Sequence, residues 1–208
     1  MEALFDLFGH FCGQQIDHTW LPGGVPLPVC QRCTGLYVGA ALAVGLMGWF
    51  RPRLDGWFLL VHGAFLLGIA PFRLDWIEDG PSMRTITGFL YGAAVAVLLA
   101  RWPVEVLGCL ARFRRPRPAL EGGGEVAWPR ERRLPRCDGA GAWGYWVGLS
   151  VGVAVLPLLC LNGGSLALWV LAGGIAAGGL SLVLLLILNV LAFIWLVARR
   201  RGVCAAPA

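Results

Sequence analysis

The stretch Pro28-Val29-Cys30-Gln31-Arg32-Cys33-Thr34-Gly35-Leu36-Tyr37 places a C-x-x-C pair where a long apolar segment begins. Proline is favoured in the first turn of a helix, because its missing N–H would have no partner there. A helix that starts near Pro28 puts Cys30 and Cys33 on one face, at the positive end of the helix dipole and beside Arg32. This environment favours the thiolate, which binds metals and attacks disulfides. The stretch therefore predicts a thiol site at the mouth of a helix.

Composition predicts a membrane protein. The chain has 208 residues, of which 58% are hydrophobic and 14% are charged, and its mean hydropathy is +0.71. These values are too apolar for a soluble domain of this length, and apolar runs of nearly bilayer-crossing length recur. The predicted fold class is all-α, a polytopic transmembrane helical bundle of about five spans, at residues 34–50, 56–69, 82–100, 143–161 and within 165–197.

The last apolar region is too long for one untilted crossing, at about 1.5 Å per residue against about 30 Å of hydrocarbon. The pairs Gly173-Gly174 and Gly178-Gly179 are candidates for a break into a short piece and a full span. Five segments are expected: an outward-facing Cys/His segment (1–33), a three-span core (34–100), an Arg-rich cytoplasmic loop (101–142), two further spans (143–201) and a tail (202–208).

Arginine placement predicts the orientation. The net charge is +5, and all seventeen basic residues are arginines. With five spans, fourteen of them fall on one side of the membrane, and only Arg32, Arg73 and Arg84 fall on the other. The positive-inside rule makes the side with fourteen cytoplasmic. We therefore expect an outward N-terminus, a multi-pass protein of the cytoplasmic membrane of a prokaryote, and the lipid bilayer rather than nucleic acid as partner.

Three cysteines on the outward side carry the clearest chemistry. His10, Cys12, Cys30 and Cys33 form a candidate metal site, because three sulfurs and one imidazole suit tetrahedral zinc, or iron. His18 is an alternative fourth ligand. The same thiols could instead exchange electrons, with Cys30 and Cys33 as the redox pair and Cys12 as a resolving thiol. A static disulfide from Cys12 to one of the pair is the third interpretation.

Polar residues outside the cysteines suggest weaker hypotheses. The outward loop carries Asp75, Glu78, Asp79 and Arg84, and salt-bridged loop closure is favoured there over ligand binding. If the loop binds a ligand, Asp75 and Arg84 are the candidates. His62 and Asn189, inside predicted spans, are interpreted as hydrogen-bonding to neighbouring helices. Glycines at 35, 39, 45, 88 and 92 indicate close helix packing.

A family resemblance covers about residues 8–100. Cys12 and Gln14, then P-x-C-x-R-C-x-G-x-Y-x-G from Pro28 to Gly39, then Asp75 and the R-x-x-T-G segment Arg84–Gly88, resemble the prokaryotic membrane proteins of the domain of unknown function 2085 family. One departure is Gly13, where the family has a histidine; His10 or His18 could stand in for it. The resemblance implies a membrane protein and gives no established activity.

Three functions follow from these observations. The leading hypothesis is an integral membrane protein with an outward-facing metal site. The second is a membrane thiol/disulfide oxidoreductase that uses Cys12, Cys30 and Cys33. The third is a non-catalytic accessory subunit that packs against other membrane-protein subunits in a larger complex.

Overall fold

The structure, a computed structural model, describes residues 2–13, 16–74, 76–113 and 139–204. These residues form helices joined by short turns: α1 (Glu2–Gly9), the 3-10 turns η1 (Ile16–His18) and η2 (Pro22–Gly24), α2 (Gln31–Phe50), α3 (Gly56–Leu67), α4 (Ala70–Arg73), α5 (Pro81–Phe113), α6 (Gly139–Asn162) and α7 (Ser165–Cys204). The described part of the chain contains no β-strand, so the predicted all-α fold class is confirmed.

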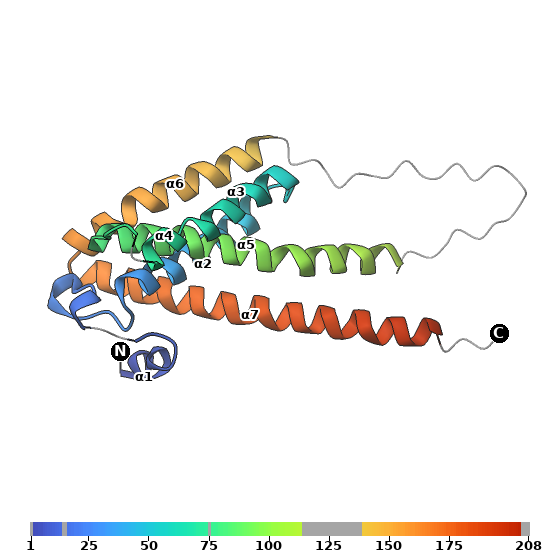
Figure 1. The fold of residues 1–208 in the computed structure, drawn as a ribbon, viewed down its shortest axis with the longest axis horizontal. Helices are drawn as coiled ribbons and strands as arrows, with labels where there is room; N and C mark the ends of the chain where they lie inside the picture. Colours follow the sequence, from blue (N-terminus) through green and yellow to red (C-terminus); the bar gives the residue numbers. More distant parts are fainter. Residues whose placement is uncertain (1, 14–15, 75, 114–138, 205–208) are drawn as a thin grey trace, which may run out of the picture.

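Four of the described helices are long and apolar enough to cross a membrane: Gln31–Phe50, Pro81–Arg101, Ala140–Asn162 and Ser165–Ala198. The second predicted span corresponds to a shorter apolar helical stretch, Gly56–Phe72. This stretch leads the chain back along the bundle, so that α5 starts beside the start of α2 (Figure 1). Of the roughly five predicted spans, four therefore coincide with helices long enough to cross a membrane, and the second coincides with a shorter apolar stretch.

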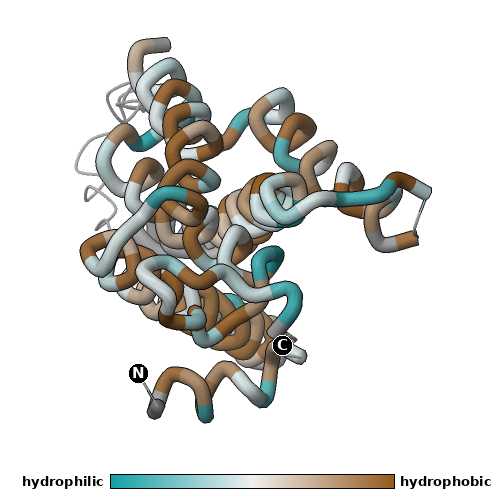
Figure 2. Tube along the Cα trace, turned by 90° about the vertical axis from the view of Figure 1, so that its left-hand side faces the viewer, coloured by the Kyte–Doolittle hydropathy of each residue, from teal (hydrophilic) through white to brown (hydrophobic). Residues whose placement is uncertain are grey.

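The bundle has two distinct ends. One end, here called the cysteine end, holds the first turns of α2 and α5 and the turn between α6 and α7 (Figure 1). The other, the arginine end, holds Arg51 after α2 and Arg101 in α5. Helix α1 lies crosswise to the long helices at the cysteine end (Figures 1 and 2). Which end faces the cytoplasm stays a prediction from the arginine distribution.

Helices α2 and α5 run side by side with their backbones in contact. A Cβ added at Gly35 would overlap the carbonyl oxygen of Thr85, and one at Gly39 would overlap that of Phe89. Reciprocally, a Cβ at Gly88 or Gly92 would overlap a carbonyl oxygen of α2. Small residues four positions apart let membrane helices approach this closely. The predicted packing role is confirmed for these glycines and is wrong for Gly45, which has no atom within 4 Å of its added Cβ.

Helix α7 is continuous from Ser165 to Cys204, so the glycine pairs do not break it. Gly178 instead allows contact with the backbone of Tyr37 in α2, and Gly174 lies against Val38. Asn189 donates its Nδ2–H to the carbonyl oxygen of Leu99 in α5, at 2.8 Å. The helix-to-helix interpretation of Asn189 is confirmed.

His62 joins α3 to α6 inside an aromatic cluster. Its Nδ1 lies 2.8 Å from the carbonyl oxygen of Phe58, and its Nε2 lies 2.8 Å from the hydroxyl of Tyr145. Because a carbonyl only accepts, Nδ1 carries a proton and donates to Phe58, while Nε2 shares a hydrogen bond with the Tyr145 hydroxyl. Both side chains are fully buried. His62 is therefore a buried residue that hydrogen-bonds to a neighbouring helix, as the sequence suggested.

Candidate metal centre at the cysteine end

Cys30 is the N-cap of α2. Its backbone is extended, and its carbonyl accepts the first helical hydrogen bond, from the Thr34 N–H at 2.8 Å. Pro28 and Val29 are buried and precede the helix, which begins at Gln31 rather than near Pro28 as predicted. As a result Cys33 lies in the first helical turn, beside the N-cap. The local sequence thus presents both thiols at the same helix end.

Cys12 reaches this place by way of α1. After that helix ends, the N–H groups of Phe11 and Cys12 both donate to the carbonyl of Phe8, at 3.0 and 2.8 Å. The Phe8 ring packs on Tyr37 of α2 with its centroid at 4.9 Å. This contact fixes the end of α1 against the bundle. Cys12, which follows that end, is only 4% exposed.

The segment between Cys12 and Cys30 folds back on itself. Thr19 pairs with Cys30 in an isolated antiparallel bridge, and the Leu27 N–H donates to the carbonyl of Trp20 at 3.0 Å. The buried Trp20 indole donates to Thr85 Oγ1 of α5 at 2.8 Å. The segment is therefore attached both to the start of α2 and to α5, which holds Cys12 over the C-x-x-C turn.

The three sulfur atoms form one cluster. The Sγ atoms of Cys12, Cys30 and Cys33 all lie within 4.8 Å of one another, and the Cys30 N–H points to Cys12 Sγ at 3.3 Å. Sulfurs that share one tetrahedral zinc, at about 2.3 Å each, are about 3.8 Å apart. The cluster can therefore hold a metal ion after a small inward movement of its thiolates, or form a disulfide between two of its members.

The predicted fourth ligand is not among the clustered atoms. His10 is exposed, and its Nδ1 lies 2.9 Å from the carbonyl oxygen of Asp6 in the preceding turn. In the part of the chain that the structure describes, neither His10 nor His18 has a ring nitrogen in the group that the three sulfurs form. The prediction of His10 as a ligand therefore depends on a change in its side-chain orientation.

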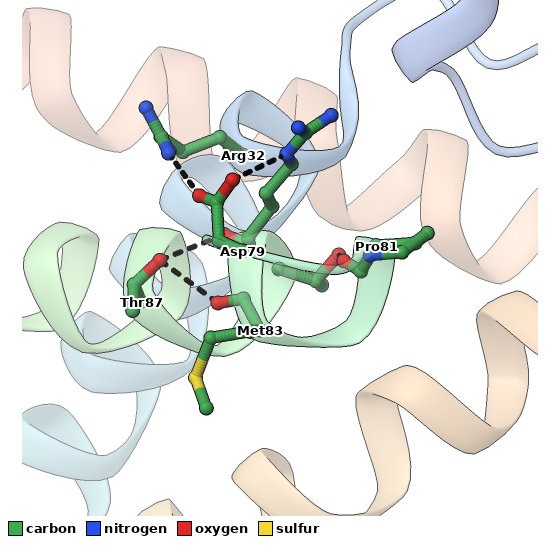
Figure 3. A network of polar contacts seen from close by, with 7 residues as sticks. Arg32, Asp79, Pro81, Met83 and Thr87 are labelled. Atoms are coloured by element: carbon green, nitrogen blue, oxygen red, sulfur yellow. Dashed lines mark hydrogen bonds and ion pairs between the residues drawn. The ribbon is translucent and has the colours of Figure 1, made fainter. Parts of the chain in front are cut away.

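A carboxylate joins the first turns of α2 and α5 at the same end (Figure 3). Asp79 Oδ2 accepts from the Arg32 guanidinium, and Asp79 Oδ1 accepts from Arg84 Nε at 2.8 Å. Burial alone would raise the pKa of the Asp79 carboxyl, but the hydrogen bonds and charges of Arg84 and Arg32 outweigh it and hold that pKa below its usual value. Asp79 is therefore a carboxylate across the physiological range.

The loop prediction is partly corrected by this geometry. Salt-bridged closure is confirmed for Arg84, whose partner is Asp79. Asp75, the carboxylate predicted for binding, lies outside the described residues, and Glu78 is exposed. Sequence reasoning did not identify the pairing with Arg32. The sequence did contain a signal for this pairing. Arg32 follows Cys30 at the start of one long predicted helix, and Arg84 follows the acidic loop at the start of another.

The ion pairs also position the thiols. Arg32 stands between Cys30 and Cys33 in the chain, so its bond to Asp79 fixes the same helical turn that carries Cys33. On the α5 side, Thr87 Oγ1 lies 2.8 Å from the carbonyl oxygen of Met83 and 3.1 Å from that of Arg84 (Figure 3). The C-x-x-C turn is thus attached to α5 by charge as well as by the glycine contacts.

Fold and site together define a small polytopic helical membrane protein with a cysteine cluster at one end of its bundle. Residues 12–98 match the family described as predicted membrane protein (DUF2085), which confirms the resemblance seen in the sequence. The match includes all three clustered cysteines, Asp79 and Arg84, and excludes α6 and α7. No curated protein matches the chain. No solved structure matches it either.

Proposed function

We propose that this membrane protein binds a metal ion such as zinc through the thiolates of Cys12, Cys30 and Cys33. The observation that carries the proposal is the convergence of three sulfurs from two separate segments within 4.8 Å. Thiolates are favoured ligands of zinc and iron, and C-x-x-C supplies half of many structural sites. The bound ion would attach the N-terminal segment to the start of α2.

His10 is our candidate for the fourth ligand. It precedes Cys12 by two residues and is exposed, so its ring has room to turn from Asp6 toward the cluster. Three sulfurs and one imidazole would complete a closed, structural site, whereas three sulfurs and a water would leave an open position for chemistry. The arginine distribution supports an outward position for this centre.

Thiol exchange is the second candidate, because the clustered thiols also meet its geometric needs. Cys30 and Cys33 lie at a helix N-terminus, which favours thiolates, and Cys12 is close enough to act as the resolving thiol. In this function two thiols form a disulfide and pass two electrons and two protons to an oxidant such as a quinone. The protein would then be a membrane oxidoreductase.

Elemental analysis of the full chain, purified in detergent without chelators, tests the metal proposal. We expect about one zinc or iron per chain, lost in Cys12→Ser, Cys30→Ser and Cys33→Ser because each removes a ligand. Cys160→Ser is the matched control, since Cys160 is buried in α6 and is not part of the cluster. A native protein without metal after growth in zinc and iron would contradict the proposal.

Thiol mapping of the same samples separates the alternatives. A metal centre predicts reactive thiols that appear only when a chelator is added. Redox function predicts a disulfide among the three cysteines that opens with reductant and re-forms with a quinone. A disulfide that persists unchanged in all conditions would indicate a structural bridge. Stable co-purification of a second membrane protein, together with tolerance of Cys30→Ser, would instead support the accessory-subunit prediction.

A further inference from the structure

We infer that α1 is an in-plane membrane anchor, which inserts one apolar edge into the hydrocarbon of the leaflet at the cysteine end. The inference concerns a surface of the N-terminal segment and does not depend on what the three sulfurs bind. It starts from the apolar side chains of α1 and of the turn that follows it, which are Leu4, Leu7, Phe8 and Phe11. Residues spaced by three and four positions share one face of a helix.

Only half of this face is used for packing within the chain. Phe8 is buried and packs on Tyr37, and Leu4 is half-buried against the core. Leu7 is 56% exposed and Phe11 is 76% exposed. Because these two side chains are four positions apart, they form one uncovered patch, here called the apolar edge.

The apolar edge continues onto the lipid-facing surface of α7. Leu7 and Phe11 line a groove of about 510 Å³ together with Val183 and Leu186 of α7, whose side chains are also exposed. Both α7 residues belong to the candidate span Ser165–Ala198. Exposed apolar side chains of a membrane span face the hydrocarbon. The groove therefore opens to lipid, and the apolar edge borders the same hydrocarbon as α7.

The direction of α1 fits a helix that lies in the membrane surface. It runs crosswise to α2, α5 and α7, which contain three of the candidate spans, at the cysteine end of the bundle (Figures 1 and 2). A helix crosswise to membrane spans lies parallel to the membrane plane. An amphipathic helix in this position buries its apolar side about 5–10 Å into the boundary between headgroups and acyl chains. Asp6 and His10, which are exposed and one turn apart, supply the polar side.

Relaxation of fluorine labels tests this inference in the full chain, reconstituted in phosphatidylcholine nanodiscs. Trifluoromethyl-phenylalanine replaces one residue at a time. Its relaxation is measured with dissolved oxygen, which concentrates in hydrocarbon, and with a gadolinium chelate, which stays in water. Labels at Leu7 and Phe11 should show the oxygen-dominated relaxation of a label at Val183, the hydrocarbon reference. A label at Asp17, exposed at the cysteine end, should show chelate-dominated relaxation and is the water reference.

Two results would overturn the inference. Chelate-dominated relaxation at Leu7 and Phe11 would place the apolar edge in water. Protection of both labels from both agents would show that protein, either a partner or a second copy of this chain, covers the edge. Photo-crosslinking from benzoylphenylalanine at Phe11 is an independent measurement: phospholipid adducts are expected, and adducts to polypeptide in their place would contradict the inference.

Discussion

At the residue scale, Asp79 is the carboxylate on which two guanidiniums converge. Its side chain is 10% exposed, against 20% for Arg32 and 25% for Arg84. In Asp79→Asn the arginines would face each other without a counter-charge. We expect the free energy of unfolding to fall by about 2 kcal/mol, between the values for exposed and fully buried pairs. Denaturant unfolding in mixed micelles measures this, with exposed Glu78→Gln as the neutral control.

The same carboxylate predicts a pH dependence. Because the pKa of folded Asp79 lies below its ordinary value of 3.8, its stabilising effect is complete above that value. It is lost as the pH falls through the lower, folded pKa. The difference in melting temperature between the native protein and Asp79→Asn should therefore be constant near neutral pH and shrink as the pH falls below 3.8. A difference that grows on acidification would disprove the assignment of Asp79.

At the scale of elements, the backbone contact between α2 and α5 predicts which glycines resist substitution. Gly35→Ala puts a methyl group into the carbonyl of Thr85, which only a separation of the helices can relieve. We expect a loss of about 1–3 kcal/mol in unfolding free energy. Gly45→Ala, in open space on the same helix, should be neutral or stabilise by up to about 1 kcal/mol. Equal effects of the two substitutions would show that this contact is not tight.

Hydropathy alone was sufficient to find the helices and insufficient to find their partners. Apolar windows predicted α2, the apolar part of α5 and α6 to within a few residues, because burial in lipid needs only length and composition. The predicted loop 101–142 was wrong at its start, since α5 continues to Phe113. The glycine pairs in α7 had two physical readings, a break or a close contact. Only the position of Tyr37 beside Gly178 decides between them. That information lies in another helix.

In the candidate site, too, the sequence predicted what is local and missed what depends on a second element. The C-x-x-C spacing and a helix start were enough to place Cys30 and Cys33 together, since both belong to one turn. Asp79 could not be separated from Asp75 by sequence, because the choice depends on how the loop meets the first turns of two helices. The orientation of His10 likewise depends on a local bond to Asp6 that spacing does not encode.

At the scale of the whole molecule, the arginine distribution predicts which end faces outward. Asp17→Cys, exposed at the cysteine end, should react with a membrane-impermeant maleimide in intact cells. Arg53→Cys, exposed at the other end, should react only after the membrane is permeabilised. Labelling above that of the native protein is the measurement. The reverse pattern would place the cysteine cluster in the cytoplasm, where thiols are kept reduced and a stable disulfide is not expected.

Because Cys12 follows the crosswise helix α1, the three sulfurs of the cysteine cluster are not attached to the bundle in the same way. Two of its sulfurs belong to a helix that is locked to α5 by glycine contacts and by Asp79, whereas the third follows a short helix whose end is fixed to the bundle through Phe8. Any event at the bilayer surface that detached α1 would withdraw one donor and leave two in place. If a metal is bound as proposed above, its retention would then depend on the docking of α1 against the bundle.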